Sequence, residues 1–198
     1  MSTCNWKKEI LTIPNLLSLF RLLLIPVYIT VYVRATQTEQ ASYYYLAAGI
    51  LAISSLTDMI DGKIARHFQM ISTVGKILDP LADKATQFSM IVCLALRYPV
   101  LIYLIILFVI KELFQLIMGG FTLLKKHKML EGALLAGKIC TTVLFISLIL
   151  MVMLPSLSTK TVTIITIVDS VFVLFSFVQY IFAYFGKNKK IRDLPERE

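Results

Sequence analysis

Charged residues are scarce in this chain. Asp, Glu, Lys and Arg make up only 16% of its 198 residues, whereas hydrophobic residues make up 58%. Soluble domains carry about 25% charged and about 45–50% apolar residues. Disorder is excluded, because it requires low hydrophobicity. A helical crossing of a bilayer needs about 20 residues, so about six crossings would use most of the chain, and the composition predicts a small multi-span membrane protein.

Cysteine is also scarce and follows no metal-binding pattern. Cys4, Cys93 and Cys140 have no CxxC spacing, which argues against a zinc site. Cys93 and Cys140 lie in apolar runs, where cysteine acts as a small packing residue, so no disulfide is expected. A cleavable signal peptide is not expected either. The first apolar run follows Lys7, Lys8 and Glu9 and lacks a small-residue cleavage pattern.

Acidic residues are fewer than basic residues. The chain has 20 Lys and Arg against 12 Asp and Glu, a net charge of +8. In a soluble protein this balance would suggest nucleic acid, but no nucleic-acid-binding motif is present. In a membrane protein, Lys and Arg collect on the cytoplasmic side and contact anionic lipid. The sequence therefore predicts membrane lipid, and not nucleic acid, as the partner of these basic residues.

Long apolar segments predict an all-α bundle of six transmembrane helices, with residues 1–198 forming a single membrane-embedded domain. The expected spans are Asn15 to Val33, Tyr43 to Thr57, Val74 to Tyr98, Val100 to Leu124, Ala133 to Leu154 and Val162 to Tyr184. The second span is expected to continue as a polar extension through Arg66. A short interfacial helix is expected at residues 3–13, with Trp6 at headgroup level, and a plain linker is the alternative.

Basic residues sort strongly to one side of these spans. With the N-terminus in the cytoplasm, twelve Lys and Arg fall in cytoplasmic segments, and only Arg34, Arg97 and Lys160 fall on the opposite side. An excess of basic residues marks the cytoplasmic side of a membrane protein. We therefore expect a multi-pass protein of the cell membrane with both termini in the cytoplasm.

Four aspartates lie at the cytoplasmic ends of two neighbouring spans. Asp58 and Asp61 are three residues apart in the second, and Asp79 and Asp83 are four apart in the third. Each pair shares one helical face, so two adjacent antiparallel helices can converge four carboxylates on one pocket at the cytoplasmic face. Ionisable residues inside spans cost free energy and imply a function by default.

Divalent metal is the best counter-charge for such a cluster, because four nearby carboxylates cannot all stay ionised without cations. Hard oxygen ligands without histidine suit Mg²⁺, Mn²⁺ or Ca²⁺ and not zinc. Two metals flanking a phosphoryl group suit in-line displacement. Salt bridges to Lys and Arg are the alternative, but they explain neither the number of acids nor the small residues Gly62, Ala65 and Gly75, which would let a metal-bound diphosphate approach the backbone.

The acids and small residues together form a longer pattern. Its eight fixed positions are Asp58, Asp61, Gly62, Ala65, Arg66, Gly75, Asp79 and Asp83. In spacing and residue type the pattern resembles the complete signature of the CDP-alcohol phosphotransferases, and the six-span topology is similar to that family's. The resemblance implies cleavage of a CDP-alcohol diphosphate, release of CMP, and transfer of the phosphoryl-alcohol to an acceptor hydroxyl.

The resemblance also implies roles for individual residues. Metal ligands are implied at Asp58, Asp61, Asp79 and Asp83, with Asp83 also the base on the acceptor hydroxyl and two Mg²⁺ or Mn²⁺ ions as the cofactor. Contacts to the nucleotide are implied at Gly62, Arg66, Ser72 and Gly75. A guanidinium such as that of Arg66 is suited to clamp a phosphate. The family is typically homodimeric.

Two segments resemble bacterial phosphatidylglycerophosphate synthases, at Ile13 to Arg21 and Leu78 to Lys84. In that resemblance Asn15 and Ser18 reach the CDP-lipid and Arg21 lies one turn deeper. Snorkelling of Arg21 toward the interface is the alternative. Pro80 lies between two of the acids and is expected to kink its helix.

Two lysines in later spans fit the same resemblance. Lys111 and Lys138 are expected to bind the phosphate of the acceptor, although interhelical ion pairs of Lys111 and Glu112 are equally consistent with the sequence. Asp169 lies deep in the sixth span and is assigned no role from the sequence; a dimer contact and a hydrogen bond within the bundle are both consistent with it.

The predicted reaction is transfer of the phosphatidyl group from CDP-diacylglycerol to sn-glycerol 3-phosphate, which releases CMP and gives phosphatidylglycerophosphate. Phosphatidylglycerol as the acceptor, which would make a cardiolipin synthase, is the closest alternative. A divalent-cation transport site is less favoured, because transport predicts acids near the middle of the membrane with exits on both faces. A purely structural scaffold leaves the acids unexplained.

Overall fold

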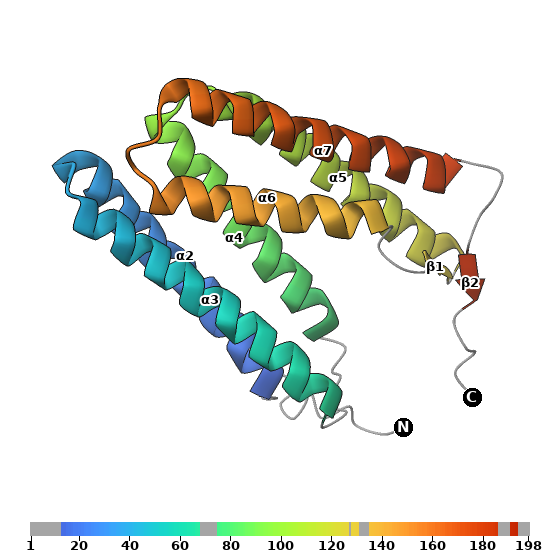
Figure 1. The fold of residues 1–198 in the computed structure, drawn as a ribbon. Helices are drawn as coiled ribbons and strands as arrows, with labels where there is room; N and C mark the ends of the chain where they lie inside the picture. Colours follow the sequence, from blue (N-terminus) through green and yellow to red (C-terminus); the bar gives the residue numbers. More distant parts are fainter. Residues whose placement is uncertain (1–12, 68–74, 127, 131–134, 186–190, 194–198) are drawn as a thin grey trace. The chain divides into compact units, whose positions relative to one another are not determined.

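The protein is described by a computed structural model that covers residues 13–67, 75–126, 128–130, 135–185 and 191–193. Only the backbone is described for residues 13–14, 58–67, 75–77, 119–126, 128–130, 135–136, 185 and 191–193. The described chain forms six helices and two short strands, so the all-α prediction is confirmed in its main elements (Figure 1). The interfacial helix expected at residues 3–13 lies almost entirely outside the described residues, since α2 begins at Ile13.

The helices follow the predicted spans closely. They are α2 (Ile13–Thr38), α3 (Ala41–His67), α4 (Gly75–Arg97), α5 (Leu101–Lys126), α6 (Leu135–Met153) and α7 (Thr159–Phe185). Three of them, within Asn15–Thr38, Leu101–Met118 and Thr159–Tyr184, are long and apolar enough to cross a membrane. A shorter apolar helix covers Gly137–Met153. The polar extension predicted after the second span is helical, because α3 continues to His67.

Helix ends coincide with the residues that favour them. Helix α4 ends at Arg97, two residues before Pro99, and helix α6 ends at Met153, two residues before Pro155. Helices usually end at or before the residue that precedes a proline. Helix α7 begins after Ser158, whose hydroxyl accepts a hydrogen bond from the Thr161 amide at 3.2 Å, as an N-cap does.

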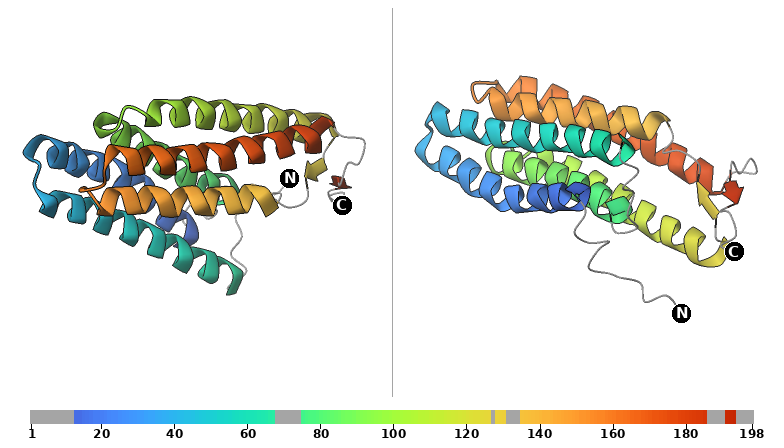
Figure 2. Two further views of the ribbon diagram at one scale, coloured as in Figure 1. Left: turned by 45° about the horizontal axis from the view of Figure 1, so that its top comes forward. Right: turned by 90° about the horizontal axis from the view of Figure 1, so that it is seen from below.

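The chain divides into two compact units. The first contains α2, α3, α4 and the end of α6, and the second contains α5, most of α6, and α7. In the first unit, α2 and α3 lie side by side as a hairpin, and α2 also packs along α4 (Figures 1 and 2). The turn of this hairpin is only two residues long. Glu39 adopts φ 53° there, and its amide donates to the Ala35 carbonyl at 3.0 Å, which caps α2.

Small and aromatic residues fill the core of the first unit. Ala35 and Ala47 are buried where α2 meets α3, and small side chains allow two helices to approach closely. Tyr32 packs on Tyr28 and edge-on against Tyr44, with ring centroids 5.9 and 5.7 Å away. This packing fixes the rotation of α2 and α3 about their axes, and so determines which of their residues face each other.

In the second unit, α5 and α7 run in the same direction and pack against each other. The Tyr98 hydroxyl donates to the Leu157 carbonyl at 3.3 Å near the starts of both helices. Phe114 lies edge-on to Phe177 and Tyr184 toward their other ends. The strands β1 (Lys128–Leu130) and β2 (Ile191–Asp193) form an antiparallel pair, which the sequence did not predict.

Candidate active site

Two of the four motif aspartates are described with their side chains, and both lie near the start of α4. Asp79 and Asp83 are one helical turn apart, so their carboxylates share a face of the helix. The Asp79 side chain is partly exposed, and that of Asp83 is 49% exposed. Two carboxylates on one accessible helix face can act together on one bound group.

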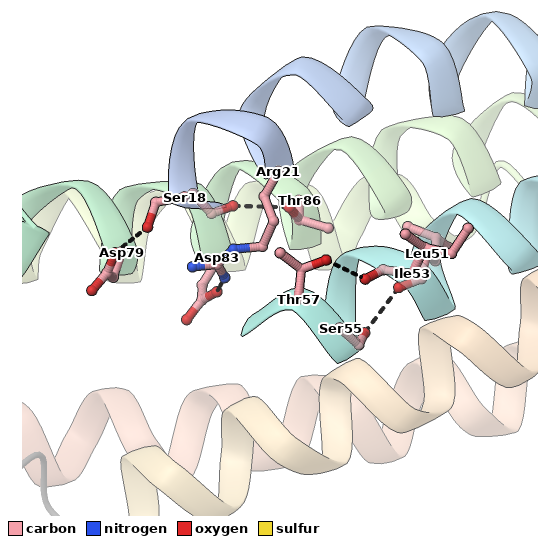
Figure 3. A network of polar contacts seen from close by, with 10 residues as sticks. Ser18, Arg21, Leu51, Ile53, Ser55, Thr57, Asp79, Asp83 and Thr86 are labelled. Carbon is pink, nitrogen blue, oxygen red and sulfur yellow. Dashed lines mark hydrogen bonds and ion pairs between the residues drawn. The ribbon is translucent and has the colours of Figure 1, made fainter. Parts of the chain in front are cut away.

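Helix α2 provides a hydrogen-bond donor to each of these carboxylates. The Ser18 hydroxyl donates to Asp79 Oδ1. Arg21 Nη1 donates to Asp83 Oδ1 and forms an ion pair with it (Figure 3). Ser18 and Arg21 are three residues apart on α2 and their partners are four apart on α4, so both contacts form when the helices pack in the same direction.

Both donors are buried. The exposed fraction is 0% for Ser18 and 2% for Arg21. Arg21 therefore does not extend outward along the helix, as the snorkelling alternative would require, but points into the first unit. The contacts of Arg21 and Ser18 with the acids were not predicted from the sequence, although both pairs are spaced by about one helical turn.

A small pocket lies beside Arg21, between α2, α3 and α4. Ser54, Thr86 and Ser89 contribute hydroxyl groups to its lining, and Tyr28 and Leu51 are among its other residues. Its enclosed space suffices for about one water molecule. Arg21 thus contacts a carboxylate and also lines a small pocket that contains three hydroxyl groups.

Asp58 and Asp61 belong to the last turns of α3, but their side chains lie outside the described part of the structure, as do those of Gly62 and Arg66. Ser54, one turn before Asp58, lines the pocket beside Arg21. The backbone of α3 therefore brings Asp58 to the end of the first unit that holds the α4 acids.

Gly75 is the first residue of α4, and Ser72 lies outside the described residues. Asn15 is buried in the first turn of α2, close in sequence to Ser18. Pro80 lies inside α4, which continues through it. The kink expected at this proline stays a prediction.

The chemistry of the donors fits a hard divalent cation. Asp79 and Asp83 present carboxylate oxygens from successive turns, and such oxygens are the ligands that Mg²⁺ and Mn²⁺ prefer. Among the side chains that the structure describes, no group of three or more His, Cys, Asp or Glu comes together. A complete site at this position would therefore need Asp58 and Asp61 from α3.

In the second unit, Lys111 is buried and paired within its own helix. Its Nζ lies 2.9 Å from Glu112 Oε1, and its exposed fraction is 3%. This pair joins neighbouring residues of α5, and the interhelical pairing stays a prediction. Lys138, in contrast, is exposed near the start of α6.

Asp169 has a hydrogen-bond partner within the bundle. The Ser147 hydroxyl donates to Asp169 Oδ2 at 2.6 Å, which joins α6 to α7. Lys111, Glu112 and Asp169 all lie near enough to Cys140 for their charges to act on it. The second unit therefore contains its own buried polar cluster.

Comparison with known proteins gives a family for this arrangement. The family model described as CDP-alcohol phosphatidyltransferase matches residues 11–182. A cardiolipin synthase (CMP-forming) of Streptomyces coelicolor is 35% identical over 119 residues, which is 60% of this chain and 54% of that protein. A CDP-diacylglycerol–glycerol-3-phosphate 3-phosphatidyltransferase of Rickettsia bellii is 38% identical over 73 residues, 36% of this chain and 38% of that protein.

A third relative is a fusion protein of Schizosaccharomyces pombe, a cardiolipin synthase (CMP-forming) joined to a mitochondrial hydrolase. It is 41% identical over 91 residues, 46% of this chain and 14% of that protein. The matches thus span about half, or less, of the relatives' own lengths. Since the family model covers most of the chain and includes all eight motif positions, the chain belongs to the CDP-alcohol phosphatidyltransferase family.

Proposed function

We propose that this chain is a membrane-embedded phosphatidyltransferase that moves the phosphatidyl group of CDP-diacylglycerol to a glycerol hydroxyl and releases CMP. The observation that carries the proposal is the pair of motif carboxylates on α4, each held by a donor from α2. Loosely held acids on a lipid-exposed helix would not give a defined reaction geometry. Buried donors instead fix the acids before a substrate arrives.

Asp83 is the residue that we assign to proton transfer. One of its oxygens accepts from Arg21, and Figure 3 shows the other pointing away from the guanidinium. In the proposed reaction this second oxygen takes the proton of the acceptor hydroxyl. The acceptor oxygen then bonds to the phosphorus of the phosphatidyl group, the bond from that phosphorus to the CMP oxygen breaks, and CMP leaves.

Divalent metal is part of the proposal, since the family generally uses such ions. We assign Asp58, Asp61, Asp79 and Asp83 as the ligands of two Mg²⁺ or Mn²⁺ ions. When bound, these ions stabilise negative charge on the transferred phosphoryl group and the leaving phosphate. Gly62, Arg66, Ser72, Gly75, Asn15 and Ser18 stay as predicted contacts to the CDP-lipid.

For the acceptor we propose glycerol 3-phosphate first. The support is the resemblance of two segments to phosphatidylglycerophosphate synthases and the match to the Rickettsia enzyme named for that reaction. Lys138, which is exposed, stays the predicted contact to the acceptor phosphate. Lys111 supports this assignment less, because its ammonium is buried against Glu112.

Phosphatidylglycerol is the second candidate acceptor. Two relatives named as cardiolipin synthases match longer stretches of this chain than the Rickettsia enzyme does. This alternative leaves the proposed chemistry of the aspartates unchanged.

Release of CMP from CDP-diacylglycerol tests the proposal. The purified protein in lipid nanodiscs would be assayed with Mg²⁺ or Mn²⁺ and with each acceptor separately. We expect release that depends on both metal and acceptor. Dependence on glycerol 3-phosphate would support the first assignment, and dependence on phosphatidylglycerol the second. Absence of release with either acceptor would contradict both.

The proposed location is the cell membrane, with both termini and the site on the cytoplasmic side. Six helices, an even number, place both ends of a spanning bundle on the same side, and the distribution of basic residues favours the cytoplasm. The homodimer implied by the family resemblance stays a prediction.

A further inference from the structure

The contact between Arg21 and Asp83 has an electrostatic consequence for the proposed metal site. The guanidinium bonds to an oxygen of a carboxylate that we assign as a metal ligand. A divalent cation on Asp83 would therefore sit close to a fixed positive charge. At such distances, like charges repel strongly wherever water is partly excluded.

Arg21 cannot relieve this repulsion by moving into water. Only 2% of its surface is exposed, and a charged group inside a membrane protein is costly unless it is paired. Lys84, next to Asp83 in sequence, differs in this respect because its side chain is partly exposed and its charge is screened by solvent. Among the side chains that the structure describes, Arg21 is thus a buried cation whose charge acts directly on Asp83.

The pocket that Arg21 lines also contains hydroxyl groups. The Thr86 hydroxyl donates to the Ala82 carbonyl at 2.9 Å, and the Ser89 hydroxyl donates to the Thr86 carbonyl at 2.7 Å. Both hydroxyl oxygens therefore keep lone pairs that can accept hydrogen bonds at the pocket wall. These groups are neutral, so they do not cancel the charge of Arg21.

We infer that Arg21 is a positioning residue that couples metal binding to binding of the nucleotide diphosphate. Without nucleotide, Arg21 holds Asp83 in its orientation and its charge lowers the affinity of the site for divalent metal. The anionic diphosphate of a CDP-alcohol offsets this charge, so metal and nucleotide bind together more tightly than either binds alone. This inference rests on the proposed metal site.

Binding of Mn²⁺, measured by calorimetry or by electron paramagnetic resonance on the full chain in nanodiscs, tests the inference without an activity assay. In the unmodified protein we expect CDP to raise Mn²⁺ affinity at least about tenfold beyond Mn²⁺ binding to CDP itself. This measurement needs no variant, so it does not depend on whether a substituted protein folds. Equal Mn²⁺ affinity with and without CDP would overturn the inference.

Arg21→Gln removes the charge of Arg21 and should separate its effect on metal affinity from its effect on turnover. We expect Mn²⁺ affinity in the absence of CDP to rise about tenfold or more, the enhancement by CDP to shrink, and turnover to fall because Asp83 loses its support. A merely structural role would lower both metal affinity and turnover. Unchanged or weaker Mn²⁺ binding in a folded Arg21→Gln protein would therefore overturn the inference.

Two further variants complete the test. Arg21→Lys keeps the charge and should keep Mn²⁺ affinity within about threefold, while turnover falls because an ammonium cannot reproduce the guanidinium geometry. Arg34→Gln removes the same charge from an exposed position on the same helix and should change neither quantity. If the unmodified protein binds no Mn²⁺ even with CDP, the proposed metal site itself fails. If it binds Mn²⁺ but Arg21→Gln behaves like Arg34→Gln, only the coupling fails.

Discussion

At the scale of single residues, the sequence indicates which residues are functional more readily than which residues contact each other. The motif aspartates could be singled out from sequence because their residue type and spacing are unusual in an apolar helix. That Ser18 and Arg21 donate hydrogen bonds to two of these aspartates could not be predicted from the sequence. Each contact joins residues more than 60 positions apart, and it depends on the rotation and depth of α2 against α4. That geometry is determined by side-chain packing along the helices and not by any local pattern.

The most direct prediction at this scale concerns Asp83→Asn. The amide has nearly the same shape as the carboxylate but cannot take a proton from the acceptor. We expect CMP release to fall at least about a hundredfold, the lower end of what general-base catalysis contributes. Metal-dependent CDP binding should largely persist. The measurements are initial rates of CMP release and calorimetry with CDP.

Asp169→Asn is the matched control, because it makes the same change at an aspartate of another helix that we assign to no catalytic role. Its side-chain oxygen can still accept from Ser147, so the contact between α6 and α7 is preserved. This variant should retain CMP release within a few-fold. An active Asp83→Asn protein would contradict the assignment of Asp83 as the base.

At the scale of helices and strands, the existence and order of the six helices were predictable, and their ends nearly so. Apolar length specified the spans, and Pro99 and Pro155 specified two of the ends. The pairing of Lys128–Leu130 with Ile191–Asp193 was not predictable. These strands are only three residues long and lie more than 60 residues apart, so no alternation pattern marks them.

Close approach of α6 and α7 at Gly137 gives a prediction at this scale. A Cβ at Gly137 would lie 2.7 Å from the Tyr180 hydroxyl oxygen and 3.3 Å from its ring. Gly137→Ala should therefore lower the thermal unfolding midpoint, because Tyr180 must shift. Adding Tyr180→Phe, which removes the hydroxyl, should restore part of the loss.

Gly49→Ala provides the comparison in α3. No atom lies within 4 Å of the added methyl group, so helix propensity should stabilise this variant by up to about 1 kcal/mol. Equal unfolding midpoints for Gly137→Ala and Gly49→Ala would show that Tyr180 does not limit the space at Gly137.

At the scale of the whole molecule, both compact units bury polar side chains inside apolar helices, but they do so differently. In the first unit, buried donors hold partly exposed acids, so the acids remain accessible to a ligand. In the second, Lys111, Glu112 and Asp169 are all buried. The first arrangement suits chemistry on a bound group, and the second suits stabilisation of the helix packing. The sequence alone could not separate these cases, because burial depends on which faces of the helices meet.

Orientation in the membrane is the remaining prediction for the whole molecule. Gln37 is exposed at the end of α2, and Lys126 is the last residue of α5. With both termini in the cytoplasm, Gln37 should face the outside and Lys126 the inside. Single Gln37→Cys and Lys126→Cys substitutions, in a chain that also carries Cys4→Ser, can be tested with a membrane-impermeant maleimide. The native Cys93 and Cys140 are buried and should not react.

In intact cells we expect labelling of Gln37→Cys alone, with Lys126→Cys reacting only after the membrane is permeabilised. The reverse pattern would show the opposite membrane orientation, with the motif aspartates on the outer face. Cytosolic substrates such as glycerol 3-phosphate could then not reach Asp83. The labelling pattern therefore bears on the proposed acceptor as well as on the topology. In the proposed reaction, the hydroxyl that would give its proton to Asp83 must come from the side of the membrane on which the site opens.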